Sequence, residues 1–361
     1  MPAGGRRAYS GRMIAAPSAR RAVARWLFLV AALIFLMTVI GGITRLTESG
    51  LSIVDWRPVT GALPPIGEAA WMAEFDKYRQ SPQYQLVNRG MTLDQFQQIF
   101  WWEYIHRLWG RLIGLAYAVP FAWFLWRGAI PRPYRPHLWA ALALGGLQGA
   151  VGWAMVASGL VDRPSVSQYR LVAHLGLALV IYVYLLWLGL SLWRGDRPAA
   201  DRPGRRSAPA LAVLAFLTIL SGGFVAGLDA GMTYNTFPLM EGRWVPELYG
   251  SMTPWWVDPF ENAAAVQFHH RVLASLTAAA VLAMAVRLAW TAPPSVGRLA
   301  LACGAMVAVQ FALGVATLLL HVPVALGAAH QAGAVTLLTL LVCLAHAVRR
   351  TGEPAAGKAR I

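Results

Sequence analysis

The sequence predicts an all-α integral membrane protein whose eight transmembrane helices form two parallel-repeat four-helix bundles. Three observations support this: apolar stretches of membrane-spanning length, basic residues concentrated in alternate connecting segments, and motifs of the first half that recur in the second. The chain has 361 residues, of which 57% are hydrophobic and 13% are charged. Soluble domains carry about 25% charged residues, so the composition favours a membrane protein.

Six uncharged stretches meet the length of about 20 residues that a helix needs to cross the bilayer core. They are residues 26–44, 138–161, 171–193, 207–228, 299–320 and 322–345. Two shorter stretches, 112–126 and 272–286, each begin just after a charged segment. We interpret these two as the second and the sixth of eight spans.

Lysine and arginine predict the orientation, because the cytoplasmic segments of membrane proteins are enriched in them. With a cytoplasmic N-terminus, the inner segments hold 20 basic and 3 acidic residues, and the rest of the chain holds 11 and 13. These inner segments are 1–25, 127–137, 194–206, 287–298 and 349–361. Both termini are therefore expected in the cytoplasm, and the net charge of +15 reflects membrane insertion, with no nucleic-acid partner.

The arginine-rich residues 1–25 fit two compartments. A bacterial basic tail and a mitochondrial transit peptide share this composition; we favour the first and expect a bacterial inner membrane. Both cysteines, Cys303 and Cys343, lie in predicted spans. No disulfide is therefore expected.

The spans divide the chain into two halves with long outer loops, a cytoplasmic linker and two tails. The boundaries are 1–25 for the first tail, 26–193 for the first half with outer loop 45–103, 194–206 for the linker, 207–348 for the second half with outer loop 229–265, and 349–361 for the last tail. Within 62–91, apolar residues at helical spacing predict an amphipathic helix over the outer surface. They are Ile66, Ala69, Met72, Phe75 and Tyr78.

The two halves repeat the same order of motifs. Capping-box patterns predict helix starts at residues 92–95 and at 165–168, and Asp258–Glu261 is the counterpart of the first of these. The third helix of each half carries Gln and Gly four residues apart, at 148–152 and 310–314. Because each half has an even number of spans, the repeat is parallel, unlike the inverted repeats of many transporters.

Four histidines occupy matching places in this repeat: His106 and His174 in the first half, His270 and His330 in the second. Each lies one to four turns into a helix that runs inward from the outer face, where an ionisable residue is costly and usually functional. Paired imidazoles suit iron, copper or zinc, and imidazoles hold haem iron. Because no further ligand type clusters with either pair, we favour haem, and a buried structural pair is the alternative.

The remaining histidines are expected to have no role in a site, because they lie at loops or helix ends or lack a counterpart in the other half. They are His137, His269, His321 and His346.

Two positions near the first histidine of each pair can be compared between the halves, and one of them differs. Arg107 and Arg271 follow His106 and His270; they would bind haem propionates or reach toward the membrane interface. Three residues before these histidines stand Glu103 and Gln267, on the same helix face. Only the glutamate can transfer a proton or stabilise a positive charge. The first half is therefore predicted to be reactive and the second to carry electrons.

Several longer motifs resemble one known family, over nearly the whole chain outside the tails. They are residues 41–50 (GGITRLTESG), 56–61 (WRPVTG), 100–111 (FWWEYIHRLWGR), 152–159 (GWAMVASG), 227–231 (GLDAG), 234–240 (YNTFPLM), 267–271 (QFHHR) and 330–331 (HQ). The chain resembles the haem A synthases in these motifs. The long first outer loop without a cysteine pair is similar to their proteobacterial and mitochondrial branch.

The resemblance implies that the chain oxidises the methyl group at porphyrin position C8 of haem O to a formyl group, giving haem A for terminal oxidases. His270 and His330 would bind a resident haem b. His106 and His174 would line the site where haem O binds and haem A leaves, with Glu103 beside it. Either two successive hydroxylations or a carbocation stabilised by Glu103 would complete the oxidation.

Two other functions are weighed against this one. A dihaem electron-transfer cytochrome predicts equivalent pockets, which the difference between Glu103 and Gln267 disfavours; a transporter predicts charges at mid-membrane, whereas here they gather at the outer edge. The partners expected from the resemblance are haem O, membrane lipids, the farnesyltransferase that makes haem O, oxidase assembly factors and a second copy of the chain. The sequence does not identify an electron donor.

Overall fold

The computed structural model describes residues 17–57, 60–161, 164–195 and 203–349, and their regular structure is helical. Eight of the described helices are long and apolar enough to cross a membrane, as predicted. They are α1 (Pro17–Leu46), α4 (Leu93–Trp126), α5 (Arg135–Ala157), α6 (Gln168–Arg194), α7 (Ser207–Gly227), α9 (Ala263–Thr291), α10 (Pro294–Leu319) and α11 (Val324–Val348). The chain is thus a multi-pass membrane protein.

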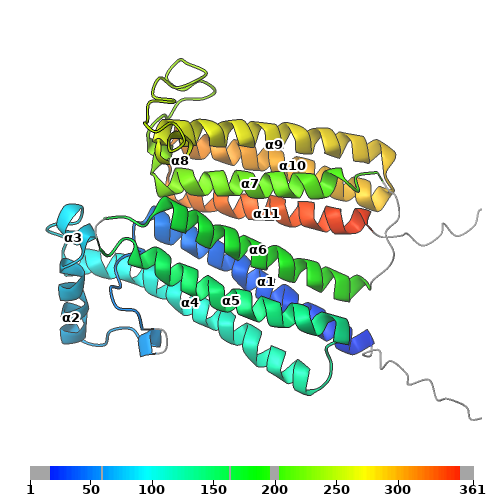
Figure 1. Cartoon of the computed structure of the whole chain (residues 1–361), viewed down its shortest axis with the longest axis horizontal. Helices are drawn as coiled ribbons and strands as arrows, with labels where there is room; N and C mark the ends of the chain where they lie inside the picture. Colours follow the sequence, from blue (N-terminus) through cyan, green and yellow to red (C-terminus); the bar gives the residue numbers. More distant parts are fainter. Residues whose placement is uncertain (1–16, 58–59, 162–163, 196–202, 350–361) are drawn as a thin grey trace, which may run out of the picture.

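The long helices form two four-helix groups that lie side by side (Figure 1). In the first group α1 packs against α4 and α6, and α5 packs against the same two helices. In the second group α7 and α10 likewise pack against α9 and α11. Each histidine-bearing helix therefore faces its partner across a bundle whose other two helices carry no predicted ligand.

The first and last helices of each group form the contact between the groups, α1 with α11 and α6 with α7. Polar contacts cross this boundary at several depths. At the outer end Arg45 forms an ion pair with Asp229 at 2.7 Å, and within the membrane the side-chain amide of Gln331 donates to the carbonyl of Thr38 at 2.7 Å. The equivalent use of helices on both sides supports a twofold-like, parallel repeat.

The second and sixth spans begin earlier than the apolar stretches alone indicate. The polar turns before each stretch belong to the same helix, so α4 has 34 residues and α9 has 29. At 1.5 Å per residue α4 is about 51 Å long, well beyond the bilayer core of roughly 30 Å. Its first turns therefore stand outside the membrane, and helical residues 93–103 and 263–265 are part of what was predicted as outer loop.

Of the predicted capping boxes, the one at the start of α4 is confirmed. The Thr92 side chain accepts from the backbone N–H of Gln95, and the Gln95 side chain accepts from the backbone N–H of Thr92. The other two helix starts differ from the prediction. Gln168 begins α6 after Ser167, without a side-chain cap, and α9 is capped by Asn262.

Asp258–Glu261 is a separate one-turn helix, α8, which Asn262 separates from α9 because its backbone is extended. His270 therefore lies only about 10 Å along α9, whereas His106 lies about 20 Å along α4. Counted from the C-terminal ends of α4 and α9, both histidines lie about 30 Å along the helix. The two histidines therefore lie at a similar height measured from these ends, although not from the helix starts.

The segment 62–91 forms two short helices where the sequence predicted one. They are α2 (Glu68–Arg79) and α3 (Pro82–Leu86), and Ser81 caps the second. The break occurs because the residue before a proline avoids the helical conformation. Phe75 and Tyr78 are buried against Phe96 and Phe100 of the protruding part of α4, whereas Ile66 is exposed ahead of α2.

Three predicted boundaries fall partly outside the described residues. Residues 17–25 of the predicted first tail are already helical, and residues 1–16 lie outside the described part of the chain. The same holds for 196–202 of the predicted linker and 350–361 of the last tail. Cys303 and Cys343 are free thiols on α10 and α11.

Candidate paired-histidine sites

His270 of α9 and His330 of α11 face each other inside the second bundle. Their ring centroids are 6.5 Å apart and their planes are 89° to each other. A metal ion bound on opposite sides by two imidazole nitrogens at about 2 Å each would put the centroids roughly 6.4 Å apart. The separation would therefore allow His270 and His330 to hold one metal ion between them.

Each of the four predicted histidines packs against a glycine on a neighbouring helix, at a place where an added Cβ would crowd the ring. A Cβ at Gly152 would lie 2.8 Å from Cε1 of His174, and one at Gly314 would lie 2.7 Å from Cε1 of His330. For His270 and His106 the corresponding glycines are Gly222, at 3.0 Å from Cε1, and Gly41, at 3.3 Å from Nε2. The two halves use the same device, so the rings of both pairs are held against glycine-lined helix faces.

A glutamine from the third helix of each half fixes the second histidine of the pair. The Nε2 atom of Gln148 lies 3.1 Å from Nδ1 of His174 and donates to the carbonyl of His174 at 3.0 Å. The Nε2 atom of Gln310 lies 3.0 Å from Nδ1 of His330 and donates to the carbonyl of that residue at 2.9 Å. This contact explains the repeated spacing of glutamine and glycine in the sequence, since both residues touch the same imidazole.

The first histidines of the pairs differ in their hydrogen bonds. Nδ1 of His270 lies 2.8 Å from the hydroxyl of Ser221 on α7. Among the described residues, no hydrogen bond reaches the His106 side chain. Sequence reasoning did not single out Ser221, because nothing in its own neighbourhood indicates that α7 brings it to a histidine 49 residues away.

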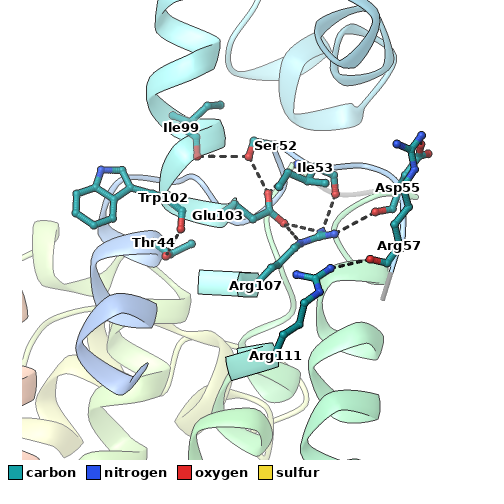
Figure 2. Close-up of polar contacts among 10 residues, drawn as sticks. All are labelled: Thr44, Ser52, Ile53, Asp55, Arg57, Ile99, Trp102, Glu103, Arg107 and Arg111. Carbon is teal, nitrogen blue, oxygen red and sulfur yellow. Dashed lines mark hydrogen bonds and ion pairs between the residues drawn. The ribbon is translucent and has the colours of Figure 1, made fainter. Parts of the chain in front are cut away.

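Glu103 is almost fully buried, at 2% exposure, and four donors surround its carboxylate (Figure 2). Oε2 accepts from the hydroxyl of Ser52 and the backbone N–H of Ile53, both at 2.8 Å. Oε1 accepts from Nε and Nη2 of Arg107, at 3.0 and 2.6 Å. The carboxylate thus joins α4 to the first outer loop while it remains one helical turn from His106.

Arg107 extends this connection along the loop. It donates to the carbonyls of Ile53 and Asp55 at 2.7 and 3.0 Å (Figure 2). One turn further along α4, Arg111 donates to the carbonyl of Arg57 at 2.7 Å. Three side chains at successive turns of α4 therefore hold residues 52–57 along the outer end of the helix.

The second half repeats this arrangement without the carboxylate. Arg271 donates to the carbonyls of Tyr234 and Thr236 at 2.9 and 2.8 Å, and to the Gln267 side chain at 3.1 Å. Gln267 in turn donates to the carbonyls of Ala230 and Tyr234. The Nε atom of Arg271 is buried without a hydrogen-bond partner. The Nε atom of Arg107, in contrast, donates to the carboxylate of Glu103. The charge of Arg107 is therefore paired with a carboxylate, whereas Arg271 has none among the described residues.

The other histidines make ordinary local contacts. His137 lies 2.8 Å from the hydroxyl of Tyr184, and His269 lies 3.1 Å from the hydroxyl of Tyr249. His346 bonds to Ser191 near the inner end of α11, and His321 lies in the turn between α10 and α11. Within the described ranges, no three histidine, cysteine or acidic side chains gather as a metal site.

The fold and these contacts define a class: an eight-span membrane protein made of two similar bundles, each with a histidine pair held near its outer end. The chain belongs to the cytochrome oxidase assembly protein family (COX15-CtaA), whose model matches residues 24–342. Similar proteins named haem A synthase occur in Nitrosospira multiformis, with 48% identity over 92% of this chain and 94% of the relative, and in Rhodospirillum centenum, with 49% over 95% and 92%. A third, from Parvibaculum lavamentivorans, is 50% identical over 90% of this chain and 94% of its own length. The resemblance stated from the sequence motifs is thereby confirmed.

Proposed function

We propose that this chain is a haem A synthase that oxidises the C8 methyl group of haem O to a formyl group. One observation carries the proposal most directly: two matched histidine pairs lie in matched bundles, and only one of them has a buried carboxylate beside it. Relatives that match nearly the whole chain bear the name of this activity. A dihaem cytochrome that only transfers electrons would not require a buried carboxylate beside one histidine pair and not the other.

His270 and His330 are proposed as the residues that would hold the iron of a resident haem b. The ring separation of 6.5 Å and the glycines behind both rings support this assignment. When bound, a haem of this kind supplies one-electron transfer. The protein's part is to hold both rings at the right separation within an apolar bundle, which sets how firmly the haem is retained.

Arg271 is proposed to pair with a haem propionate. Its charge has no carboxylate partner among the described residues, and its Nε–H is buried and unpaired. A buried unpaired donor is unfavourable, and a carboxylate is the acceptor that a guanidinium prefers. Arg107 is a weaker candidate, because Glu103 already neutralises it.

His106 and His174 are proposed to bind haem O and to release haem A, and Glu103 is proposed as the catalytic group beside them. A carboxylate offers about four lone-pair directions, and here four donors fill them. A carboxylate held in this way has its acceptor positions occupied and its orientation fixed. Of the two roles left open by the sequence, the contacts favour stabilisation of a positive charge that develops on the substrate.

The test is to purify the native chain, extract its haems and separate them by chromatography. We expect haem b together with haem O, a hydroxylated intermediate or haem A. His270→Ala or His330→Ala should abolish the low-spin haem b spectrum while the protein still inserts, because each removes one axial nitrogen. His269→Ala is the matched control and should keep the spectrum, because His269 bonds to Tyr249 in the outer loop. Haem b alone in the native chain would favour the electron-transfer cytochrome, and a normal spectrum in either ligand variant would refute the assignment.

A further inference from the structure

The hydroxyl of Ser221 lies between two groups, the carbonyl of Thr218 at 2.7 Å and Nδ1 of His270 at 2.8 Å. When its single hydrogen goes to the carbonyl, which can only accept, Oγ meets Nδ1 with a lone pair. A neutral imidazole has one N–H and one acceptor nitrogen. With the hydroxyl hydrogen on the Thr218 carbonyl, Nδ1 is the donor and the lone pair of Nε2 is free for a metal ion.

The repeat identifies the residue that takes this place in the first half. Gly222–Gly223 of α7 corresponds to Gly41–Gly42 of α1, because Gly222 and Gly41 pack against the first histidines of the two pairs. The same offset of 181 residues relates Asp229 to Glu48, which both have positive φ, at 50° and 52°. It also relates the carbonyls of Tyr234 and Ile53, which accept from Arg271 and Arg107. Ser221 therefore corresponds to Ile40.

The side chain of Ile40 cannot accept a hydrogen bond, and no described side chain or carbonyl bonds to the His106 ring. The second histidines of the pairs do not share this difference, since Gln148 and Gln310 contact them in the same way. The asymmetry in ring support is thus confined to His106 and His270. His270, which has the extra hydrogen bond, belongs to the site proposed to keep its haem. His106, which lacks it, belongs to the site proposed to exchange haem.

We infer that Ser221 is a positioning residue that orients His270 for permanent haem binding, and that Ile40 leaves His106 unsupported so that haem can enter and leave the first site. The inference rests on the proposed function and deepens it, because it names what separates the retained haem from the exchanged one. Hydrogen bonds to a metal-bound imidazole orient the ring and make it a stronger ligand. Losing one typically lowers metal affinity about 10- to 100-fold.

The experiment measures how fast haem b leaves the purified full-length protein when excess apomyoglobin is added as a haem acceptor. Ser221→Ala removes the hydroxyl without adding bulk, and it should speed the loss of haem b about 10- to 100-fold and raise its midpoint potential. Ser221→Thr keeps a hydroxyl and should restore the native rate. Ser275→Ala is the control, because the Ser275 hydroxyl bonds only to the carbonyl of Arg271 on its own helix. Ile40→Ser should slow the release of haem from the first site.

The outcomes separate the inference from the function on which it rests. Loss at the same rate in Ser221→Ala, Ser275→Ala and the native chain, with an unchanged potential, would overturn the role of Ser221 and leave the haem assignment standing. A native chain that holds no haem b would overturn both. Faster loss in Ser221→Ala with native behaviour in Ser221→Thr would establish the positioning role, because a merely structural change would not be rescued by the second hydroxyl.

Discussion

Glu103 has Gln267 as its counterpart in the second half, and its surroundings decide what it can do. It is buried, paired with Arg107 and bonded to Ser52 and the backbone of Ile53. The Gln267–Arg271 pair holds the equivalent loop in the second half without a negative charge. A glutamine is therefore compatible with this architecture, and we propose that the glutamate at position 103 serves through its charge.

Glu103→Gln should consequently separate catalysis from folding. We expect the conversion of haem O to haem A to fall about 100-fold or more, the usual scale for removing a group that stabilises charge in a transition state. Haem b should stay at the native level, because its ligands lie in the other bundle. The measurement is the ratio of haem O to haem A in membranes that express the variant, together with haem b content.

The control for this substitution is Glu261→Gln, which removes another outer-face carboxylate, one that bonds to Tyr169. It should leave the ratio unchanged. If Glu103→Gln makes haem A at the native rate, Glu103 only anchors the loop to α4 through Arg107.

At the scale of elements, the outer ends of the helices that carry the first histidines are anchored by different means. α4 begins with an exposed capping box and is covered by α2. α9 begins at Asn262, which follows the short helix α8, and the buried Asp258 accepts from the backbone N–H groups of Gly250 and Met252 and from the Asn262 side chain. The start of α9 is thus tied to the second outer loop by one carboxylate.

Asp258 makes this anchor dependent on pH. Burial opposes its ionisation, but the hydrogen bonds from Asn262, Met252 and Gly250 outweigh burial and lower its pKa below the ordinary value of 3.8. A carboxyl whose pKa is lower in the folded state stabilises the fold above pH 3.8, and that stabilisation is lost as the pH falls through the folded-state pKa. Asp258→Asn removes the titrating group.

We therefore expect Asp258→Asn to lower the apparent Tm in detergent at pH 7, and the difference from the native chain to shrink as the pH falls below 3.8. Thermal melts over a pH series measure this. Asp76→Asn is a suitable comparison, because Asp76 lies on the exposed side of α2, where its pair with Arg79 contributes little. A difference that stays constant down to the acid limit would contradict the role given to Asp258.

At the scale of the whole molecule, eight spans in two parallel halves place both ends of the described chain, α1 and α11, on one side of the bundle (Figure 1). The connecting segments on that side carry the excess of basic residues. Basic residues remain preferentially in the cytoplasm. We propose that this side is cytoplasmic and that both histidine pairs lie toward the outer face of the inner membrane.

A reporter fused after Ile361 should be active only in the cytoplasm. The same reporter inserted after Gly242, in the exposed turn of the second outer loop, should be active only outside. Activity outside for the first fusion, or inside for the second, would reverse the orientation. Both fusions should leave haem b content near native, because neither site contacts a histidine pair.

The sequence by itself determined the eight spans, and it predicted the parallel repeat and the four candidate ligands. These features are local or periodic: a helix crosses the membrane because its own residues are apolar, and a repeat is visible wherever motifs recur in order. The family resemblance rests on the same contiguous motifs and is confirmed by the matched relatives. The repeated four-residue spacing from Gln148 to Gly152 and from Gln310 to Gly314 was visible in the sequence. That both residues of each repeat contact one histidine was not.

Only the tertiary structure decided what each of these residues touches. Glu103 meets Ser52 and Ile53, about 50 positions earlier, and Ser221 meets His270, 49 positions later. The break between α8 and α9 likewise depends on how the second outer loop returns to Asn262. Hydrogen bonds between residues so far apart in the sequence depend on how helices and loops pack. They cannot be predicted from the sequence pattern of a single segment.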